Sequence, residues 1–209
     1  MNMNLFNNAF PFFRLFQKQA GTLGDAAKKL DGLFRDFKAV PDQCKYIDTL
    51  AATGDMTCRE IERELSLTFI ESLDREDIRD LNRAFEQTFQ AVRAVSSRIG
   101  LYGFNRVEKG AGDLTLCLSE MAAEIGPMLE IVVRKGNGAA NRERIRKLRE
   151  DVGMFLLVGL GEVYEADNSS TGRLLETIKW TQIYDRLEDT VSCLEHIANV
   201  IGRMILRKV

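Results

Sequence analysis

The sequence contains little of what metal centres, disulfide frameworks and membrane anchors require. Among 209 residues there is one histidine, His196, which excludes a metal site built on two imidazoles. The four cysteines are scattered and form no Cys-x-x-Cys pair, which is typical of free thiols in a reducing compartment. No apolar run approaches the ~18 residues of a membrane span, and residues 1–16 lack the basic start of a secretory signal. We therefore expect a cytoplasmic protein with no transmembrane segment.

Neither sign of charge is in excess. The chain has 29 Lys and Arg against 31 Asp and Glu, a net charge of −2, so no basic field attracts nucleic acid. A composition of 45% apolar and 29% charged residues is typical of a soluble globular protein. Because there are three prolines, most of the chain is free to form long helices.

Apolar residues recur every three or four positions through most of the chain. This spacing keeps one face of a helix turned inward. Five such stripes cover residues 47–69, 78–99, 114–132, 145–163 and 183–205. The mean step is about 3.5 residues, which is the spacing of helices packed side by side in a left-handed bundle. Short connections between the stripes favour antiparallel neighbours, and no comparable run alternates as a strand does.

Turn residues mark the boundaries between these helical segments. Asp74 is placed to cap the second long segment, with Leu73 packing on Ile78 as a hydrophobic staple. Further breaks are expected at residues 110–113, 135–138 and 167–172. Gly126 and Pro127 lie inside a helical stripe and predict a kink or a short break there.

The N-terminal residues 1–40 have a pattern of their own. Residues 10–38 predict one or two shorter helices packed on the bundle or extending from it, and we expect residues 1–209 to form a single domain. Five phenylalanines lie within the first 16 residues: Phe6, Phe10, Phe12, Phe13 and Phe16. They either pack against the bundle itself or form a surface for a partner, such as a second copy of the chain or a membrane transporter.

The last segment contains the best candidates for catalysis, and they are weak. Ser192 and His196 are four residues apart on one helix and can touch, with Cys193 and Glu188 nearby. Pairs of polar residues at this spacing are common, and nothing supplies an oxyanion hole or an orienting third residue. We therefore expect a protein that is not an enzyme.

Two stretches carry a resemblance to a known family. Residues 68–78 read TFIESLDREDI, and residues 178–189 read IKWTQIYDRLED, followed by EHIAN at 195–199. These motifs, the phenylalanine-rich start and the total length resemble the PhoU-like proteins, which include phosphate-transport regulators and Pit accessory proteins. The first motif departs from the family pattern because it lacks a proline in its turn. The resemblance implies an all-α, antiparallel helix bundle of two pseudo-repeated three-helix units.

The resemblance also implies a position for metal sites, because some relatives hold metal clusters with Glu/Asp-x-x-x-Asp motifs. Residues at i and i+4 share a helix face, so two carboxylates can converge on a hard cation. The matching positions are Ala51 and Asp55, Glu86 and Gln90, Arg149 and Gly153, and Glu188 and Ser192. Three of the eight expected carboxylates remain, and Glu195 adds a nearby fourth.

This departure predicts that the metal clusters are lost. Arg149 replaces an acid and can pair with Asp55, Glu86 or Glu188 in place of a metal cation. We therefore expect no cofactor. The alternative is a single divalent cation on the surviving candidates, Asp55, Glu86, Glu188 and Glu195.

The resemblance implies a non-enzymatic regulatory or accessory role in inorganic phosphate transport, exercised by docking. The expected partner is a phosphate permease or another cytoplasmic protein, which would bring the chain to the membrane surface from the cytoplasm. The alternative function is a metal-binding helical bundle that senses a divalent cation through its residual acidic residues. A homo-oligomer is compatible with either function.

Overall fold

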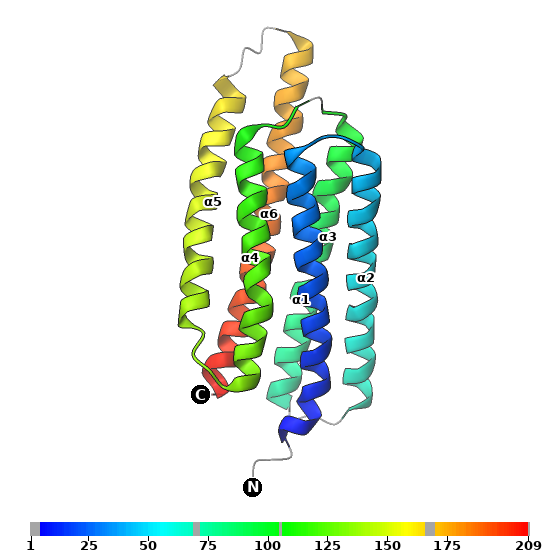
Figure 1. Ribbon diagram of the computed structural model, residues 1–209, viewed down its shortest axis with the longest axis vertical. Coiled ribbons are helices and arrows are strands. Elements are labelled where there is room, and N and C mark those ends of the chain that lie inside the picture. Colours follow the sequence, from blue (N-terminus) through cyan, green and yellow to red (C-terminus); the bar gives the residue numbers. More distant parts are fainter. Residues whose placement is uncertain (1–4, 69–71, 105, 166–169, 209) are drawn as a thin grey trace.

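The chain folds into long helices that run up and down one axis. The computed structural model describes residues 5–68, 72–104, 106–165 and 170–208, and all regular secondary structure in these ranges is helical. The helices are α1 (Leu5–Arg35), α2 (Val40–Leu67), α3 (Ser72–Tyr102), α4 (Lys109–Arg134), α5 (Ala139–Glu165) and α6 (Thr171–Lys208). The start of α1 and the end of α6 lie at the same end of the bundle (Figure 1). The predicted all-α bundle is confirmed.

The bundle consists of two three-helix units joined side by side. Helices α1, α2 and α3 all contact one another, and so do α4, α5 and α6. Helix α1 packs on α4, and α3 packs on α6, so the two units share one core (Figure 1). In this arrangement α2 and α5 lie at opposite outer edges of the molecule. The predicted pair of pseudo-repeated units matches this arrangement.

The five predicted stripes form the core, together with residues of α1. On α3, for example, Leu81, Phe85 and Val92 are completely buried. Partly buried side chains such as Leu50 and Phe155 extend the core toward the outer edges. Seven-residue patterning was sufficient to identify the buried faces because each helix turns one stripe toward its neighbours.

The N-terminal segment differs from the prediction. Residues 5–35 form one helix of 31 residues, as long as α3, and not one or two shorter helices laid on the bundle. Phe12, Phe13 and Phe16 are buried, and the ring of Phe16 stacks on Phe85 with 5.9 Å between centroids. These three phenylalanines therefore pack into the bundle, while the side chains of Phe6 and Phe10 lie outside the described residues.

Two predicted helix boundaries were wrong, and the short break predicted at Pro127 is absent. The break expected at residues 110–113 lies inside the start of helix α4, which begins at Lys109. Helix α3 begins at Ser72, two residues before the predicted cap Asp74, whose side chain and that of Leu73 lie outside the described residues. Helix α4 continues through Pro127 without a break. A proline removes only one backbone hydrogen bond, and burial of the next residues, Met128 and Leu129, stabilises the helix beyond it.

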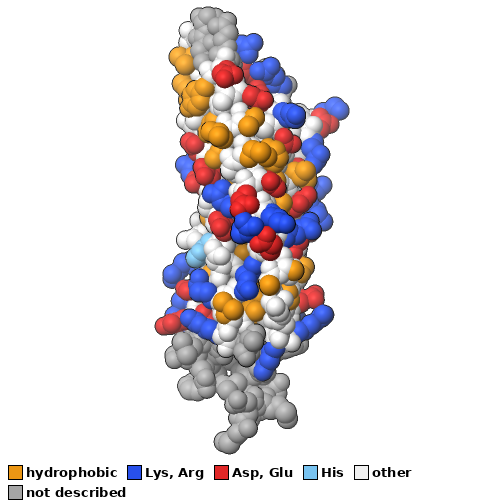
Figure 2. Space-filling view, turned by 90° about the vertical axis from the view of Figure 1, so that its left-hand side faces the viewer, with side chains coloured by type: hydrophobic (Ala, Val, Ile, Leu, Met, Phe, Trp, Pro, Cys, Tyr) orange, Lys and Arg blue, Asp and Glu red, His pale blue; other side chains and the backbone are white. Residues whose placement is uncertain are grey.

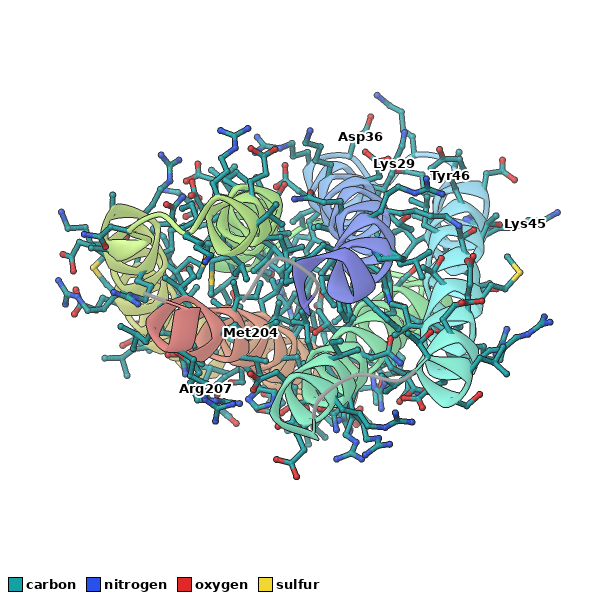
Figure 3. The ribbon with its side chains drawn as sticks, turned by 90° about the horizontal axis from the view of Figure 1, so that it is seen from below. Lys29, Asp36, Lys45, Tyr46, Met204 and Arg207 are labelled. Atoms are coloured by element: carbon teal, nitrogen blue, oxygen red, sulfur yellow. The ribbon has the colours of Figure 1, made fainter. Side chains whose placement is uncertain are left out.

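Polar contacts join the helices near both ends of the bundle. Asp77 of α3 is almost fully buried and accepts two hydrogen bonds from Nη1 of Arg207 on α6, at 2.8 and 2.9 Å. Nearer the other end, the Nζ of Lys29 on α1 lies 5.1 Å from the ring centre of Tyr46 on α2. Figure 3 shows these two pairs of helices from below, with Lys29 beside Tyr46 and Arg207 at the end of α6.

Candidate functional site

The positions that the family motif predicts fall into two groups, one in each unit. Ala51 and Asp55 lie on α2, and Glu86 and Gln90 lie on the adjacent α3. Arg149 and Gly153 lie on α5, and Glu188 and Ser192 lie on the adjacent α6. The fold therefore places each group on two neighbouring helices, as the motif requires. The side chains present in each group differ from those of a metal site.

In the first unit, an arginine holds the surviving carboxylate. The Nη2 of Arg93 on α3 lies 3.1 Å from Oδ2 of Asp55, and its Nε lies 2.8 Å from Oδ1 of Asp48. Asp55 is the more sheltered acid, with 21% of its side chain exposed against 63% for Asp48. The other oxygen of Asp55, Oδ1, is buried and has no hydrogen-bond partner. We call Arg93, Asp48 and Asp55 the first arginine clamp.

In the second unit, Arg149 holds two carboxylates of α6. Its Nη2 lies 3.5 Å from Oε1 of Glu188, and its Nε lies 3.4 Å from Oε2 of Glu195. Of the three partners predicted for Arg149, Glu188 is the one it contacts, while Asp55 is held by Arg93 in the other unit. We call Arg149, Glu188 and Glu195 the second arginine clamp.

The two clamps have the same design. In each, one guanidinium bridges two carboxylates that lie seven residues apart on the facing helix, Asp48 and Asp55 or Glu188 and Glu195. Residues two helical turns apart share a face, so one planar cation reaches both. The clamps sit on opposite outer edges of the bundle, on α2–α3 and α5–α6.

Asp48 and Arg93 are the site residues that sequence reasoning missed. The motif search considered pairs four residues apart, whereas Asp48 precedes Asp55 by seven residues. The same seven-residue step separates Glu86 from Arg93, which lies on the α3 face nearest Asp55. A search for any charge on the same helix face would have found both.

Glu86 and three replaced motif positions, Gln90, Gly153 and Ser192, belong to neither clamp. Glu86 and Gln90 are exposed, and Glu86 is close enough to the thiol of Cys58 to affect its pKa, as Asp55 also does. Ser192 is exposed, and open space surrounds the position of a Cβ at Gly153. Neither position supplies a charge that could extend its clamp.

The residues present do not fit a multinuclear metal site. Within the described ranges, no three or more His, Cys, Asp or Glu side chains gather closely enough to hold a metal ion. In each clamp a guanidinium already neutralises part of the carboxylate charge, and it would repel a divalent cation placed between the same oxygens. Arg149 occupies one of the motif positions itself, and Arg93 lies seven residues after the motif residue Glu86.

The thiols and the lone imidazole do not form a catalytic group. Burial raises the pKa of both Cys58 and Cys117 to about 11, and it also raises the pKa of Cys193, so these thiols remain protonated at neutral pH. His196 is exposed, and no hydrogen bond joins it to Ser192 in the described part of the chain.

No helix within the described ranges is long and apolar enough to cross a membrane.

Comparisons with known proteins identify what this architecture resembles. No family model matches the sequence. The chain is 24% identical over 218 residues to a Rhizobium meliloti (strain 1021) protein named "Putative pit accessory protein", covering 99% of this chain and all of the relative.

Solved structures resemble the chain over most of its length. The crystal structure of a PhoU-like protein from Shewanella oneidensis MR-1 superposes with a TM-score of 0.79 at 13% identity, covering 93% of this chain and 99% of that one. A second structure from the same organism, described as a "putative PhoU-like phosphate regulatory protein", gives a TM-score of 0.77 at 13% identity. The chain therefore has the PhoU-like fold, and the predicted resemblance to PhoU-like and Pit accessory proteins is confirmed.

Proposed function

We propose that this chain is a non-enzymatic accessory protein of inorganic phosphate transport that acts by docking on a phosphate permease. The observation that carries the proposal is the full-length match to a relative named for an accessory role, together with the PhoU-like fold. The match covers every helix of the bundle, so the resemblance is not confined to one motif.

The chemistry of the side chains supports a role without catalysis. Three thiols are buried or half-buried with raised pKa values, and a thiol that stays protonated is a poor nucleophile. Two of the surviving motif carboxylates, Asp55 and Glu188, are paired with arginines and are not placed beside a nucleophile. The bundle presents rigid helical faces, which suit recognition by another protein.

We also propose that the arginine clamps replace the metal cations of the family motif, so that the chain needs no resident cofactor. Metal analysis of the purified full chain tests this, with less than one iron, zinc or manganese ion per chain expected. A stoichiometric metal content that is lost in Glu188→Ala or Asp55→Ala would support the alternative, a bundle that senses a divalent cation. The unpartnered Oδ1 of Asp55 is the observation that keeps this alternative worth measuring.

Affinity capture tests the proposed function directly. The full chain, tagged and cross-linked in its own cells, is expected to recover a phosphate permease. A tagged unrelated helical bundle of similar length serves as the control. Repeated recovery of an unrelated complex with no permease would contradict the proposal.

A further inference from the structure

Basic side chains gather at the end of the second unit where α4 and α6 end and α5 begins. Residues 131–142 and 202–207 contain five basic residues and no acidic one. The two segments are in contact, because a Cβ at Gly202 would lie 3.4 Å from Cδ of Arg142. Near the start of α1, Arg14 lines a surface groove of about 370 Å³ together with Arg134 of α4. We call these six residues the basic end: Arg14, Arg134, Lys135, Arg142, Arg203 and Arg207.

Acidic partners neutralise only part of the charge of the basic end. Three of its arginines form ion pairs at 2.8 to 3.8 Å, and these pairs are Arg134 with Glu130, Arg203 with Asp80, and Arg207 with Asp77. Within the described part of the chain, no ion pair joins Arg14 or Arg142 to an acid. Six basic residues less three acids leave a net charge of +3. At the same end of the first unit, residues 59–67 and 75–83 contain five basic residues and four further acidic ones, so they do not cancel this charge.

The helix dipoles do not explain the basic end. A helix C-terminus attracts cations, which accounts for Arg134 in the last turn of α4. However, α2 ends at the same end of the bundle and has no basic residue in its last turn (Figure 1). Arg142 lies in the first turn of α5, where the dipole disfavours a cation. Helix stability therefore does not account for this concentration of charge.

The opposite end of the second unit carries the opposite charge. Residues 106–113, 159–165 and 170–176 contain three basic and five acidic residues, a net charge of −2. Figure 2 shows Lys and Arg side chains gathered around the lower end of the α5 side of the molecule, where α5 begins. An anionic surface therefore attracts one end of the second unit and repels the other.

We propose that the basic end binds an anionic lipid surface, with the axis of the bundle upright on the membrane. Phosphate oxygens of the headgroups accept hydrogen bonds from the guanidinium groups. Leu206 is 67% exposed between Arg203 and Arg207 and enters the interface between headgroups and acyl chains. Because the six basic residues belong to four helices that begin or end here, they address a broad surface and not a narrow peptide.

The proposed contact orients the chain and does not hold it on a membrane by itself. The attraction of basic residues to an anionic surface falls off within a Debye length, which is about 8 Å at physiological ionic strength. Stable attachment to a membrane takes a second signal besides a small basic patch. The inference adds an orientation to the proposed function and does not depend on it.

Co-sedimentation of the purified full chain with lipid vesicles at low ionic strength tests the proposal. The wild-type chain is expected to bind vesicles of equal parts phosphatidylcholine and phosphatidylglycerol, and not to bind vesicles of phosphatidylcholine alone. Arg14→Glu combined with Arg142→Glu is expected to lower the partition coefficient at least about tenfold, because two attracted groups become repelled ones. Circular dichroism confirms that the double variant is folded.

Lys45→Glu combined with Lys109→Glu is the matched control. Both lysines are exposed and lie near the starts of α2 and α4, at the opposite end of the bundle. The double change alters the net charge by the same amount as the change at the basic end. It should change the partition coefficient by less than about twofold.

Three outcomes overturn the proposal. A wild-type chain that stays in the supernatant with the anionic vesicles at low ionic strength rules out the lipid surface. Equal weakening in the two double variants shows that the overall charge of the chain, and not the basic end, decides binding. Retention on immobilised polyglutamate without binding to vesicles assigns the basic end to an acidic protein. The vesicles contain no permease, so failure here is distinguishable from failure of the proposed function.

Discussion

Two arginines pair with the acidic residues at and near the motif positions of this bundle. Arg93 and Arg149 each hold two carboxylates that would otherwise repel each other on one helix face. A guanidinium carries one positive charge and five donors in a fixed plane, so it can satisfy several carboxylate oxygens at once. Asp55 of the first clamp is less exposed than Glu188 and Glu195 of the second, so the loss of each arginine should change the free energy of unfolding by a different amount.

Arg93→Ala is expected to destabilise the chain more than Arg149→Ala. Removing Arg93 leaves Asp55 largely sheltered and unpaired beside Asp48, which costs about 1–3 kcal/mol in the free energy of unfolding. The partners of Arg149 are 40% or more exposed and lie at 3.4 Å or more, so Arg149→Ala costs less than about 1 kcal/mol. Urea unfolding of both variants measures the difference. Equal losses would mean that Asp55 needs no partner.

The buried thiols give stability a dependence on alkaline pH. Burial raises the pKa of Cys58 and Cys117 from 9.0 to about 11, so both are protonated longer in the folded chain than in the unfolded one. Their contribution is fully present below pH 9.0 and is lost as the pH rises to about 11. We expect the urea midpoint of the wild-type chain to fall between pH 9 and 11. The fall should be smaller in Cys58→Ala than in the wild type, and an unchanged slope would contradict the assignment.

At the scale of the helix, close packing of α2 on α3 depends on one glycine. Gly54 of α2 is buried against the ring of Phe89 on α3, and a Cβ at this position would overlap that ring. The glycine therefore sets the distance between the two helices that carry the first arginine clamp. Nearby, the side chain of Gln19 on α1 donates to Sγ of Cys58 at 3.1 Å, which adds a buried polar contact to the same unit.

Gly54→Ala is expected to destabilise the chain by about 1–3 kcal/mol, because the added methyl displaces Phe89 from the core. Gly21→Ala on α1 is the matched control, since nothing lies within 4 Å of a Cβ there. It should stabilise the chain by about 0.5–1 kcal/mol through helix propensity. Chemical denaturation of both variants checks the pair. A Gly54→Ala variant with an unchanged free energy of unfolding would show that α2 and α3 can move apart without destabilising the chain.

The sequence was sufficient to predict the helices but not how the N-terminal segment packs. Stripes of period 3.5 identified five buried faces because the helix period decides which residues share the face that packs inward. The same pattern in α1 was interrupted by Gly21, Gly24 and Gly32, so its continuity as one helix depended on tertiary packing. Asp48 and Arg93 were missed for a related reason, because their pairing is between helices and requires the register of α2 against α3.

At the scale of the whole molecule, the fold separates two outer edges from a shared core. Helices α1, α3, α4 and α6 join the two units, while α2 and α5 contact helices of their own unit only. Helix α5 exposes Met154, Leu157 and Val158, and α2 exposes apolar residues singly, such as Met56.

The proposed accessory role predicts where the chain is found in a cell. If the chain docks on a phosphate permease, its association with membranes should depend on that partner. Co-expression with a phosphate permease should move the chain from the supernatant into the membrane fraction after ultracentrifugation. Co-expression with a sulfate permease at the same level should leave it in the supernatant, because docking requires surface complementarity with the correct partner. Equal recovery with both permeases would show that the chain associates with membranes without recognising the phosphate permease.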